Sequence, residues 1–414
     1  MPTPRPLALA ALTVLFLASC SSLPAGPREP ASVLLVSIDG FRADYLDLGI
    51  TPNLSRVARD GVRAQWMNPS YPTLTFPNHY TMVTGLRPDH HGIVHNTMND
   101  PVLGTFKLTS DRAVGDGRWW GGEPIWVGAE KAGLPTATLF WPGSEAAIQG
   151  VRPTRWQHYD GNVSMDKRVD TVLGWLSEPA ATRPRFTTLY FDALDHAGHG
   201  FGPDAPQTRT TISEIDTAIG RLLAGLSSRE LEQRVNVVIV SDHGMAAMPA
   251  GQAIAIEDMV APVDARRVTS GEVVGFAPLP GRERSAEARL LGKHAHYECW
   301  RKSELPPHWH YGTHPRIPPI VCQTDVGWEA IPRQSLDARA KKGTRGAHGF
   351  APESPTMRAL FIAQGPAFRS GATLPPFDNV DVYPLLAKLI GIAPAANDGD
   401  LAPLLPALRD DAAR

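Results

Sequence analysis

The sequence has few cysteines and almost no excess charge. Only three of its 414 residues are cysteine, which excludes a small disulfide-rich scaffold. The formal net charge is -2, so there is no general basic character of the kind that binds nucleic acid, and we expect no stable nucleic-acid partner. The composition, 43% hydrophobic and 20% charged, is that of a globular protein with a large core.

A long apolar run occurs at the N-terminus, where residues 7–18 are too few to span a membrane as a helix. This run predicts a signal peptide over residues 1–19. Leu-Ala-Ser-Cys, ending at Cys20, resembles the lipobox of bacterial lipoproteins, and residues 20–30 would then be a linker. We therefore expect an exported, periplasmic protein, anchored to the outer membrane through the lipid on Cys20 alone. The alternative is secretion with cleavage elsewhere.

The other two cysteines, Cys299 and Cys322, are expected to form a disulfide because an exported chain folds in an oxidising compartment. The bond would close a loop over residues 300–321 and stabilise the fold by roughly 3 kcal/mol in the chain-entropy model. Two free buried thiols are the alternative.

Apolar runs separated by helical patterns predict an α/β fold. Ser32 to Ile38 is continuously apolar and ends at Asp39-Gly40, as expected of a parallel strand buried on both faces. Similar runs occur at residues 135–141, 186–192, 235–241 and 356–363. Helices are expected at residues 51–61, along the apolar stripe from Ile212 to Leu223, and at 380–390. Such alternation predicts a mostly parallel sheet with helices on both faces.

The composition changes over residues 252–342, where prolines, histidines and aromatic residues are frequent. We interpret this segment as an insertion of irregular or short β structure, stapled by the disulfide, within a catalytic core formed by residues 31–251 and 343–395. The Pro/Ala-rich tail, residues 396–414, is expected to be poorly ordered.

Acidic and histidine residues stand at the predicted strand ends. The carboxyl ends of parallel strands meet at one edge of a sheet, so these side chains are expected to converge. Aspartate and histidine are ligands that Zn²⁺ accepts, and six of them suffice for two ions. The six residues are Asp39, Asp195, His199, Asp242, His243 and His348.

Thr75 is a candidate nucleophile. It precedes Phe-Pro-Asn-His-Tyr-Thr-Met-Val-Thr-Gly, which predicts a helix that ends at Gly85. Free N–H groups at a helix N-terminus favour an anion, and coordination to a metal would lower the pKa of the threonine hydroxyl. An ordinary helix-capping role is compatible with this interpretation. The neighbouring Thr73 and Thr81 are expected to have no chemical role.

Together these motifs resemble the nucleotide pyrophosphatase/phosphodiesterase family of the alkaline phosphatase superfamily, in its bacterial exported form. They are Val-Ser-Ile-Asp39-Gly, Thr75-Phe-Pro-Asn-His-Tyr, Asp195-His-Ala-Gly-His199, Ser-Asp242-His243-Gly and His348-Gly. The resemblance covers residues 31–395 and implies an alkaline-phosphatase-like core. It also implies two Zn²⁺ ions, one held by Asp195, His199 and His348 and the other by Asp39, Asp242 and His243, with Thr75 as nucleophile and bridging ligand.

The resemblance extends to substrate-binding positions. Asn96 matches an asparagine that hydrogen-bonds a phosphoryl oxygen, while Phe76 and Tyr159 match aromatic residues on either side of a nucleobase. Leu108 and Tyr190 would line the same pocket. The implied reaction is attack of Thr75 on the α-phosphorus of a nucleotide or nucleotide derivative, releasing a nucleoside 5'-monophosphate. We treat His196 as a surface or supporting residue.

Two other functions remain open at this stage. Phospholipase C-type members would keep the metal site and bind a choline headgroup in the pocket. A non-catalytic envelope lipoprotein could use the fold for binding, although it would then have no need of the full ligand set. The sequence leaves the physiological substrate and the oligomeric state unknown.

Overall fold

The computed structural model describes residues 1–3 and 30–413 of the protein. The chain divides into two units, residues 1–30 and 31–414. The expected signal peptide, except for its first three residues, and Cys20 lie outside the described residues. None of the helices in the described part combines the length and apolar composition needed to cross a membrane.

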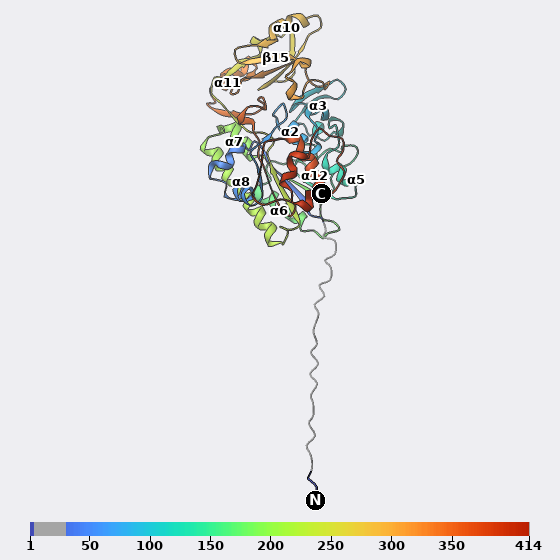
Figure 1. Ribbon diagram of the computed structural model, residues 1–414. Coiled ribbons are helices and arrows are strands. Elements are labelled where there is room, and N and C mark those ends of the chain that lie inside the picture. The colour runs from blue at the N-terminus through green and yellow to red at the C-terminus, as the bar shows by residue number, and fades with distance from the viewer. Residues whose placement is uncertain (4–29, 414) are drawn as a thin grey trace. The chain divides into compact units, whose positions relative to one another are not determined.

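A sheet of eight strands forms the centre of the second unit (Figure 1). All its pairings are parallel except those of β19, which runs antiparallel to both of its neighbours. In spatial order the strands are β20 (Ala372–Leu374), β2 (Val62–Ala64), β19 (Phe361–Gln364), β9 (Val235–Val240), β1 (Ser32–Ile38), β8 (Phe186–Phe191), β6 (Thr136–Leu139) and β7 (Arg155–Trp156).

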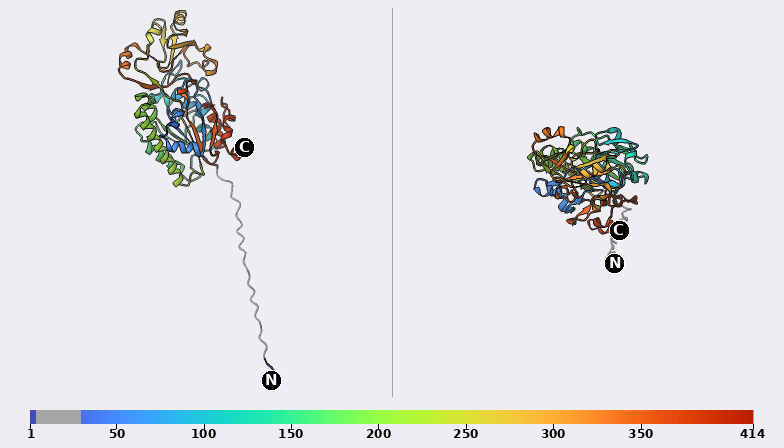
Figure 2. Two further views of the ribbon diagram at one scale, coloured as in Figure 1. Left: turned by 60° about the vertical axis from the view of Figure 1, so that its left-hand side comes forward. Right: turned by 90° about the horizontal axis from the view of Figure 1, so that it is seen from above.

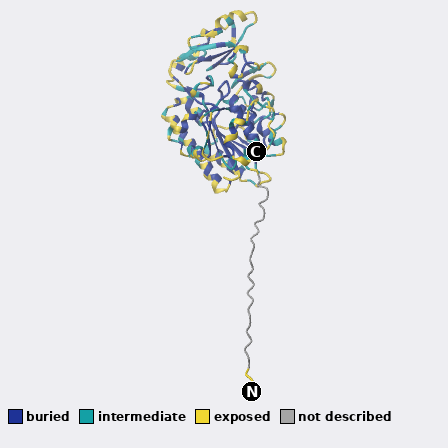
Figure 3. Ribbon diagram, in the orientation of Figure 1, coloured by how far each residue is buried: buried dark blue, intermediate teal, exposed yellow. Residues whose placement is uncertain are grey.

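Helices cover both faces of this sheet, as predicted. On one face lie α2 (Thr75–Thr84), α5 (Ile125–Lys131) and α12 (Val382–Ile390); on the other lie α1 (Pro52–Asp60), α6 (Met165–Leu176) and α8 (Pro206–Ser228). Alternate residues of β1 point to opposite faces of the sheet, so Val33 packs with the first group of helices and Leu34 with the second. Figure 3 shows the buried strands between the helical layers. The predicted α/β fold class is confirmed.

The insertion is more regular than expected. Five antiparallel strands form its sheet, in the order β12 (Ala265–Arg267), β13 (Val273–Pro278), β16 (Ile320–Thr324), β15 (Tyr297–Arg301) and β14 (Gly292–Lys293). With α10 (Glu283–Leu290) this sheet encloses its own small apolar core. Cys299 and Cys322 lie opposite each other on β15 and β16, and the predicted disulfide joins them. Figures 1 and 2 show β15 and α10 at the end of the unit away from α6.

A two-stranded ribbon forms the root of the insertion. In it, β10 (Ala246–Met248) leads out of the core and β18 (Arg345–Ala347) leads back, and the two strands pair antiparallel. The core and the insertion are thus joined through a short, hydrogen-bonded element rather than through loose linkers.

The C-terminal tail differs from the expectation of poor order. Leu404, Ala407 and Leu408 are buried, and Leu408 pairs with Phe368 in an antiparallel bridge. The prediction was wrong because the Pro/Ala-rich composition concealed a few leucines whose packing against the core could not be seen locally.

Candidate active site

The predicted ligands converge at one edge of the central sheet. Asp39 follows β1, and Asp242 and His243 follow β9. Asp195 and His199 lie on α7 (Ala193–Phe201), the helix that follows β8. His348 follows β18 and precedes β19, and it reaches the same edge because β19 runs against the other strands.

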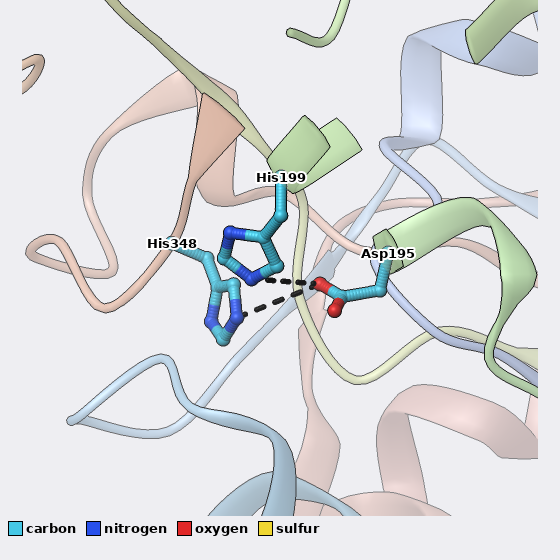
Figure 4. A group of neighbouring side chains, drawn as sticks. All are labelled: Asp195, His199 and His348. Carbon is cyan, nitrogen blue, oxygen red and sulfur yellow. Dashed lines mark ion pairs between the residues drawn. The ribbon is translucent and has the colours of Figure 1, made fainter. Parts of the chain in front are cut away.

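Asp195, His199 and His348 form the first half-site (Figure 4). The Nε2 atoms of His199 and His348 lie 3.4 and 3.5 Å from the same atom, Oδ1 of Asp195. Three ligand atoms that face one point from three directions are the arrangement expected of a metal site.

The second half-site adjoins the first. His243 Nε2 lies 2.9 Å from Asp242 Oδ2 and 3.5 Å from Asp39 Oδ1. Thr75 Oγ1 lies 3.3 Å from the same His243 Nε2, so the candidate nucleophile faces this half-site. Asp39, Asp195 and His243 also lie within reach of one common position, which places the two half-sites side by side.

The chemistry of these donors fits two divalent cations. The inward-facing oxygens Asp39 Oδ1, Asp195 Oδ1 and Asp242 Oδ2 are buried and have no hydrogen-bond partner. Buried carboxylate oxygens without a partner are costly, and a cation removes that cost. Each histidine has its Nδ1 within 2.9 Å of a backbone carbonyl, which favours a proton on Nδ1 and leaves Nε2 free to bind a metal. The three pairs are His199 with Gly346, His243 with Gly244 and His348 with Thr73.

Electrostatics in the protein alone also call for positive charge at this site. Burial raises the pKa of Asp39 above its ordinary value, and repulsion by the carboxylates of Asp242 and Asp195 raises it further. Burial and the neighbouring His243 and His199 lower the pKa of His348, which favours the neutral imidazole that a metal requires. A bound cation would stabilise the ionised carboxylates and the neutral imidazoles together.

Thr75 is the first residue of α2 and not its N-cap, which is Leu74. The helix therefore begins one residue earlier than predicted, and the backbone N–H groups of its first turn lie beside the half-site. The N–H of Phe76 donates to Asn96 Oδ1 at 3.0 Å. This bond fixes the amide of Asn96 so that its NH₂ group remains as the donor available to a ligand.

A cavity of about 490 Å³ opens over both half-sites. Every predicted substrate-binding position lines it: Phe76, Asn96, Leu108, Tyr159 and Tyr190. Tyr159 is 45% exposed and Leu108 is 41% exposed, whereas Tyr190 is 8% exposed. His196 also lines the cavity, with a largely exposed side chain.

Two supporting contacts were not foreseen from the sequence. The hydroxyl of Tyr190 donates to Asp39 Oδ2 at 2.5 Å, so this residue orients a ligand in addition to lining the pocket. Thr73, which was expected to have no chemical role, supports the site: its carbonyl lies 2.9 Å from His348 Nδ1 and its hydroxyl accepts the N–H of Gly349. The position of Tyr190 near the end of a predicted strand was the only signal for the first contact. Nothing local indicated the second.

Other polar contacts surround the candidate nucleophile, Thr75, and Tyr159 of the cavity lining. His79, fully buried, has Nδ1 2.9 Å from the carbonyl of Thr75 and 3.3 Å from Asp242 Oδ2. Near the mouth of the cavity, Tyr159 is held twice: its N–H donates to Glu145 and its hydroxyl to Asp192. The aromatic side wall of the cavity is thus fixed in place by two carboxylates.

The comparison with protein families decides the classification. A profile described as type I phosphodiesterase / nucleotide pyrophosphatase matches residues 33–351, most of the chain. The chain belongs to the type I phosphodiesterase / nucleotide pyrophosphatase family. The family inferred from the motifs is therefore confirmed, and members of this family are hydrolases.

Individual relatives support the family assignment. An uncharacterized pyrophosphatase/phosphodiesterase of Schizosaccharomyces pombe is 36% identical, with the match covering 92% of this chain and 81% of the relative. Human ectonucleotide pyrophosphatase/phosphodiesterase family member 7 is 35% identical, covering 92% and 84%. The structure of murine ectonucleotide pyrophosphatase / phosphodiesterase 5, an inactive threonine-to-alanine variant in complex with AMP, superposes with a TM-score of 0.86 and 31% identity, covering 92% of this chain and 100% of that chain.

Proposed function

We propose that this family member is a zinc-dependent phosphodiesterase and pyrophosphatase that cleaves nucleotide esters and anhydrides at the α-phosphorus. The observation that carries the proposal is the position of Thr75 Oγ1, 3.3 Å from His243 Nε2, at the base of the cavity that Asn96 and Phe76 also line. The murine relative supports it, because a threonine-to-alanine variant of that protein is described as inactive and binds AMP.

Zinc is proposed because the donors are carboxylates and imidazoles without thiolates, a set that suits Zn²⁺. Asp195, His199 and His348 would hold one ion. Asp39, Asp242 and His243, with Thr75, would hold the other, because His243 Nε2 lies close to both carboxylates and to the threonine hydroxyl. Two bound cations would supply positive charge opposite the reacting phosphoryl oxygens and lower the pKa of a hydroxyl or water beside them.

The residues of the chain then perform a two-step displacement. Thr75 Oγ1 loses its proton and forms a bond to the α-phosphorus while the bond to the leaving oxygen breaks, which gives a nucleotidyl-threonine ester. Water hydrolyses this ester in the second step and releases the nucleoside 5'-monophosphate. The NH₂ group of Asn96 and the backbone N–H of Thr75 would donate to the phosphoryl oxygens as their charge develops.

The cavity wall is proposed to bind the nucleobase. Phe76 and the largely exposed ring of Tyr159 would contact its two faces, and Leu108 and Tyr190 would complete the lining. Because Glu145 and Asp192 fix Tyr159 before a ligand arrives, little side-chain entropy is lost on binding.

Thr75→Ala tests the proposal directly. The variant should lose turnover of a nucleotide dye ester entirely while retaining zinc measured by elemental analysis. A chelator should abolish wild-type turnover, and added zinc should restore it. Substantial turnover by Thr75→Ala would exclude this threonine as nucleophile, and wild-type activity that survives complete zinc removal would exclude the metal mechanism.

A choline-headgroup phosphodiesterase is the second candidate. The outer wall of the cavity combines aromatic rings, including Phe140 and Tyr159, with the carboxylates of Glu145 and Asp192. Aromatic faces and carboxylates also attract a quaternary ammonium group. Comparing kcat/KM for a nucleotide dye ester with that for p-nitrophenyl phosphorylcholine distinguishes the two substrates.

Export and lipid anchoring through Cys20, with a periplasmic location, are part of the proposal and are supported by the Leu-Ala-Ser-Cys motif alone. Cys20→Ser should convert a membrane-associated protein into a soluble one when cell fractions are compared. An unchanged membrane fraction would argue against lipidation at this residue.

A further inference from the structure

The insertion is attached to the core through a short ribbon, and each of its two strands is close in the chain to a predicted metal ligand. On the outgoing side, β10 begins soon after His243; on the returning side, His348 directly follows the last residue of β18. The pairing of Ala246 with Ala347 places the two connections side by side. Any shift of β18 relative to the core would therefore move His348.

The first half-site depends on β18 in a second way. Gly346 of β18 offers its carbonyl to His199 Nδ1 at 2.9 Å. The same glycine lies so close to α7 that a Cβ atom placed on it would be 2.5 Å from the carbonyl oxygen of Gly198. Thus β18 orients one histidine ligand, immediately precedes another in the chain, and packs directly against the helix that bears Asp195.

A charged cluster with a buried carboxylate at its centre joins the insertion to this ribbon. We call Glu329, Arg339 and Arg345 the insertion clamp. Glu329 belongs to β17 (Glu329–Ile331) of the insertion, is 3% exposed, and accepts hydrogen bonds from Arg345 Nη2 at 2.6 Å and from Arg339 Nε at 2.5 Å. Arg339, from α11 (Leu336–Ala340), also donates to the carbonyls of Met248 and Pro249 at 3.0 and 3.2 Å.

The clamp thus holds both strands of the ribbon from the insertion side. Arg345 fixes β18, and Arg339 fixes the end of β10. A buried carboxylate that is paired with two guanidinium groups is stable only while all three groups are present, because removal of one partner leaves a desolvated charge without compensation. The ribbon is expected to move if the set is broken.

We infer that the insertion clamp is a positioning device for the metal centre, and that Arg345 acts through β18 on the half-site of Asp195, His199 and His348. The inference rests on the proposed function, which supplies the metals. Its consequence is that Arg345, a residue of the ribbon that does not line the active-site cavity, controls metal affinity at one half-site and leaves the other unchanged.

The test measures Zn²⁺ binding by purified, full-length protein in competition with a chelator, with the stoichiometry read by native mass spectrometry. Arg345→Met should lower the affinity for one of the two Zn²⁺ ions by about 10- to 100-fold, the usual effect of removing a group that orients a metal ligand. Arg345→Lys keeps the charge opposite Glu329 and should restore most of the affinity. Arg301→Met removes ion pairs to Glu287 and Glu304, both outside the ribbon and the clamp, and this variant should bind Zn²⁺ like the wild type.

A double variant separates positioning from general destabilisation. In a His199→Ala background, where the first half-site is already lost, Arg345→Met should not weaken the remaining ion further. The inference would be overturned if Arg345→Met lowered the affinity for both Zn²⁺ ions equally, or if it bound both ions with wild-type affinity. If Arg345→Met does not fold, Glu329→Asp provides the comparison: a several-fold loss at one ion supports the inference and an unchanged affinity refutes it. Absence of zinc from the wild type would instead refute the proposed function.

Discussion

The hydrogen bond from Tyr190 to Asp39 gives the most direct prediction about the metal centre. Tyr190→Phe removes only the hydroxyl, so Asp39 Oδ2 loses its buried donor and the ring still fills the same space. Because this bond favours the ionised carboxylate, its loss should raise the already elevated pKa of Asp39. A metal needs the ionised form, so protons should compete with zinc more effectively in the variant.

The magnitude follows from the chemistry of the bond. A hydrogen bond to a charged group contributes about 1.5–3 kcal/mol, and each 1.4 kcal/mol is roughly a tenfold change in an equilibrium constant. We therefore expect Tyr190→Phe to lower zinc affinity about 10- to 100-fold. The sign of the pKa change makes the loss larger as the pH falls, so the acid pH at which zinc dissociates should move upward.

The assay is chelator competition at several pH values, with turnover measured at saturating zinc. Tyr159→Phe is the matched control. It also removes a tyrosine hydroxyl that donates to a carboxylate in the same cavity, but that carboxylate belongs to Asp192, which is not one of the predicted metal ligands. This control should bind zinc normally and change KM instead. The reasoning is refuted if Tyr190→Phe binds zinc within twofold of the wild type, or if Tyr159→Phe loses as much affinity.

Three further predictions concern the transition state and the insertion. Asn96→Ala should lower kcat about 10²- to 10³-fold with little change in zinc content, as expected for the loss of one donor to a developing oxyanion; steady-state kinetics measure this. Asp89 accepts hydrogen bonds from Gly312, Thr313 and His314 of the insertion, and these bonds outweigh the effect of burial and lower its pKa. Asp89→Asn should lower the free energy of unfolding by about 1–3 kcal/mol at neutral pH. In the wild type, this contribution to stability should be present above the ordinary carboxyl pKa and should be lost as the pH falls through the lowered pKa of Asp89. Denaturant titrations at several pH values would show the loss. Reduction of the Cys299–Cys322 disulfide should lower the free energy of unfolding by roughly 3 kcal/mol, and a thermal melt should show a lower unfolding temperature.

Each of these has an outcome that would contradict it. Asn96→Ala with unchanged kcat and a higher KM would make the amide a ground-state binding group. Asp89→Asn with the pH dependence of the wild type would show that another group accounts for the acid loss of stability. An unfolding temperature unaffected by reductant would mean that the insertion is stable without its covalent link.

The sheet and the convergence of the aspartate and histidine side chains could be predicted because both follow from short-range patterns. Continuous apolar runs indicate buried strands, and a topological rule then brings their ends to one edge. That rule placed Asp39 and Asp242 for the right reason. It placed His348 correctly although β19 is antiparallel, a direction that the run at 356–363 did not encode.

The remaining features depend on partners distant in sequence. The hydroxyl of Tyr190 contacts Asp39, and the carbonyl of Thr73 contacts His348, across separations that no local pattern reports. The order of the tail likewise depends on Leu408 meeting Phe368. Each of these contacts is favourable only once the surrounding elements have been assembled.

The ribbon formed by β10 and β18 also determines when the metal centre can be completed. Thr75 and five of the expected ligands, from Asp39 to His243, precede the insertion in the chain, whereas His348 alone follows it. A chain that stops within the insertion contains all donors of one half-site but lacks a donor of the other. Because synthesis proceeds from the N-terminus, the half-site of Asp195, His199 and His348 can be completed only after the whole insertion has been made. An ion held by all three donors would therefore report a chain that extends beyond the insertion.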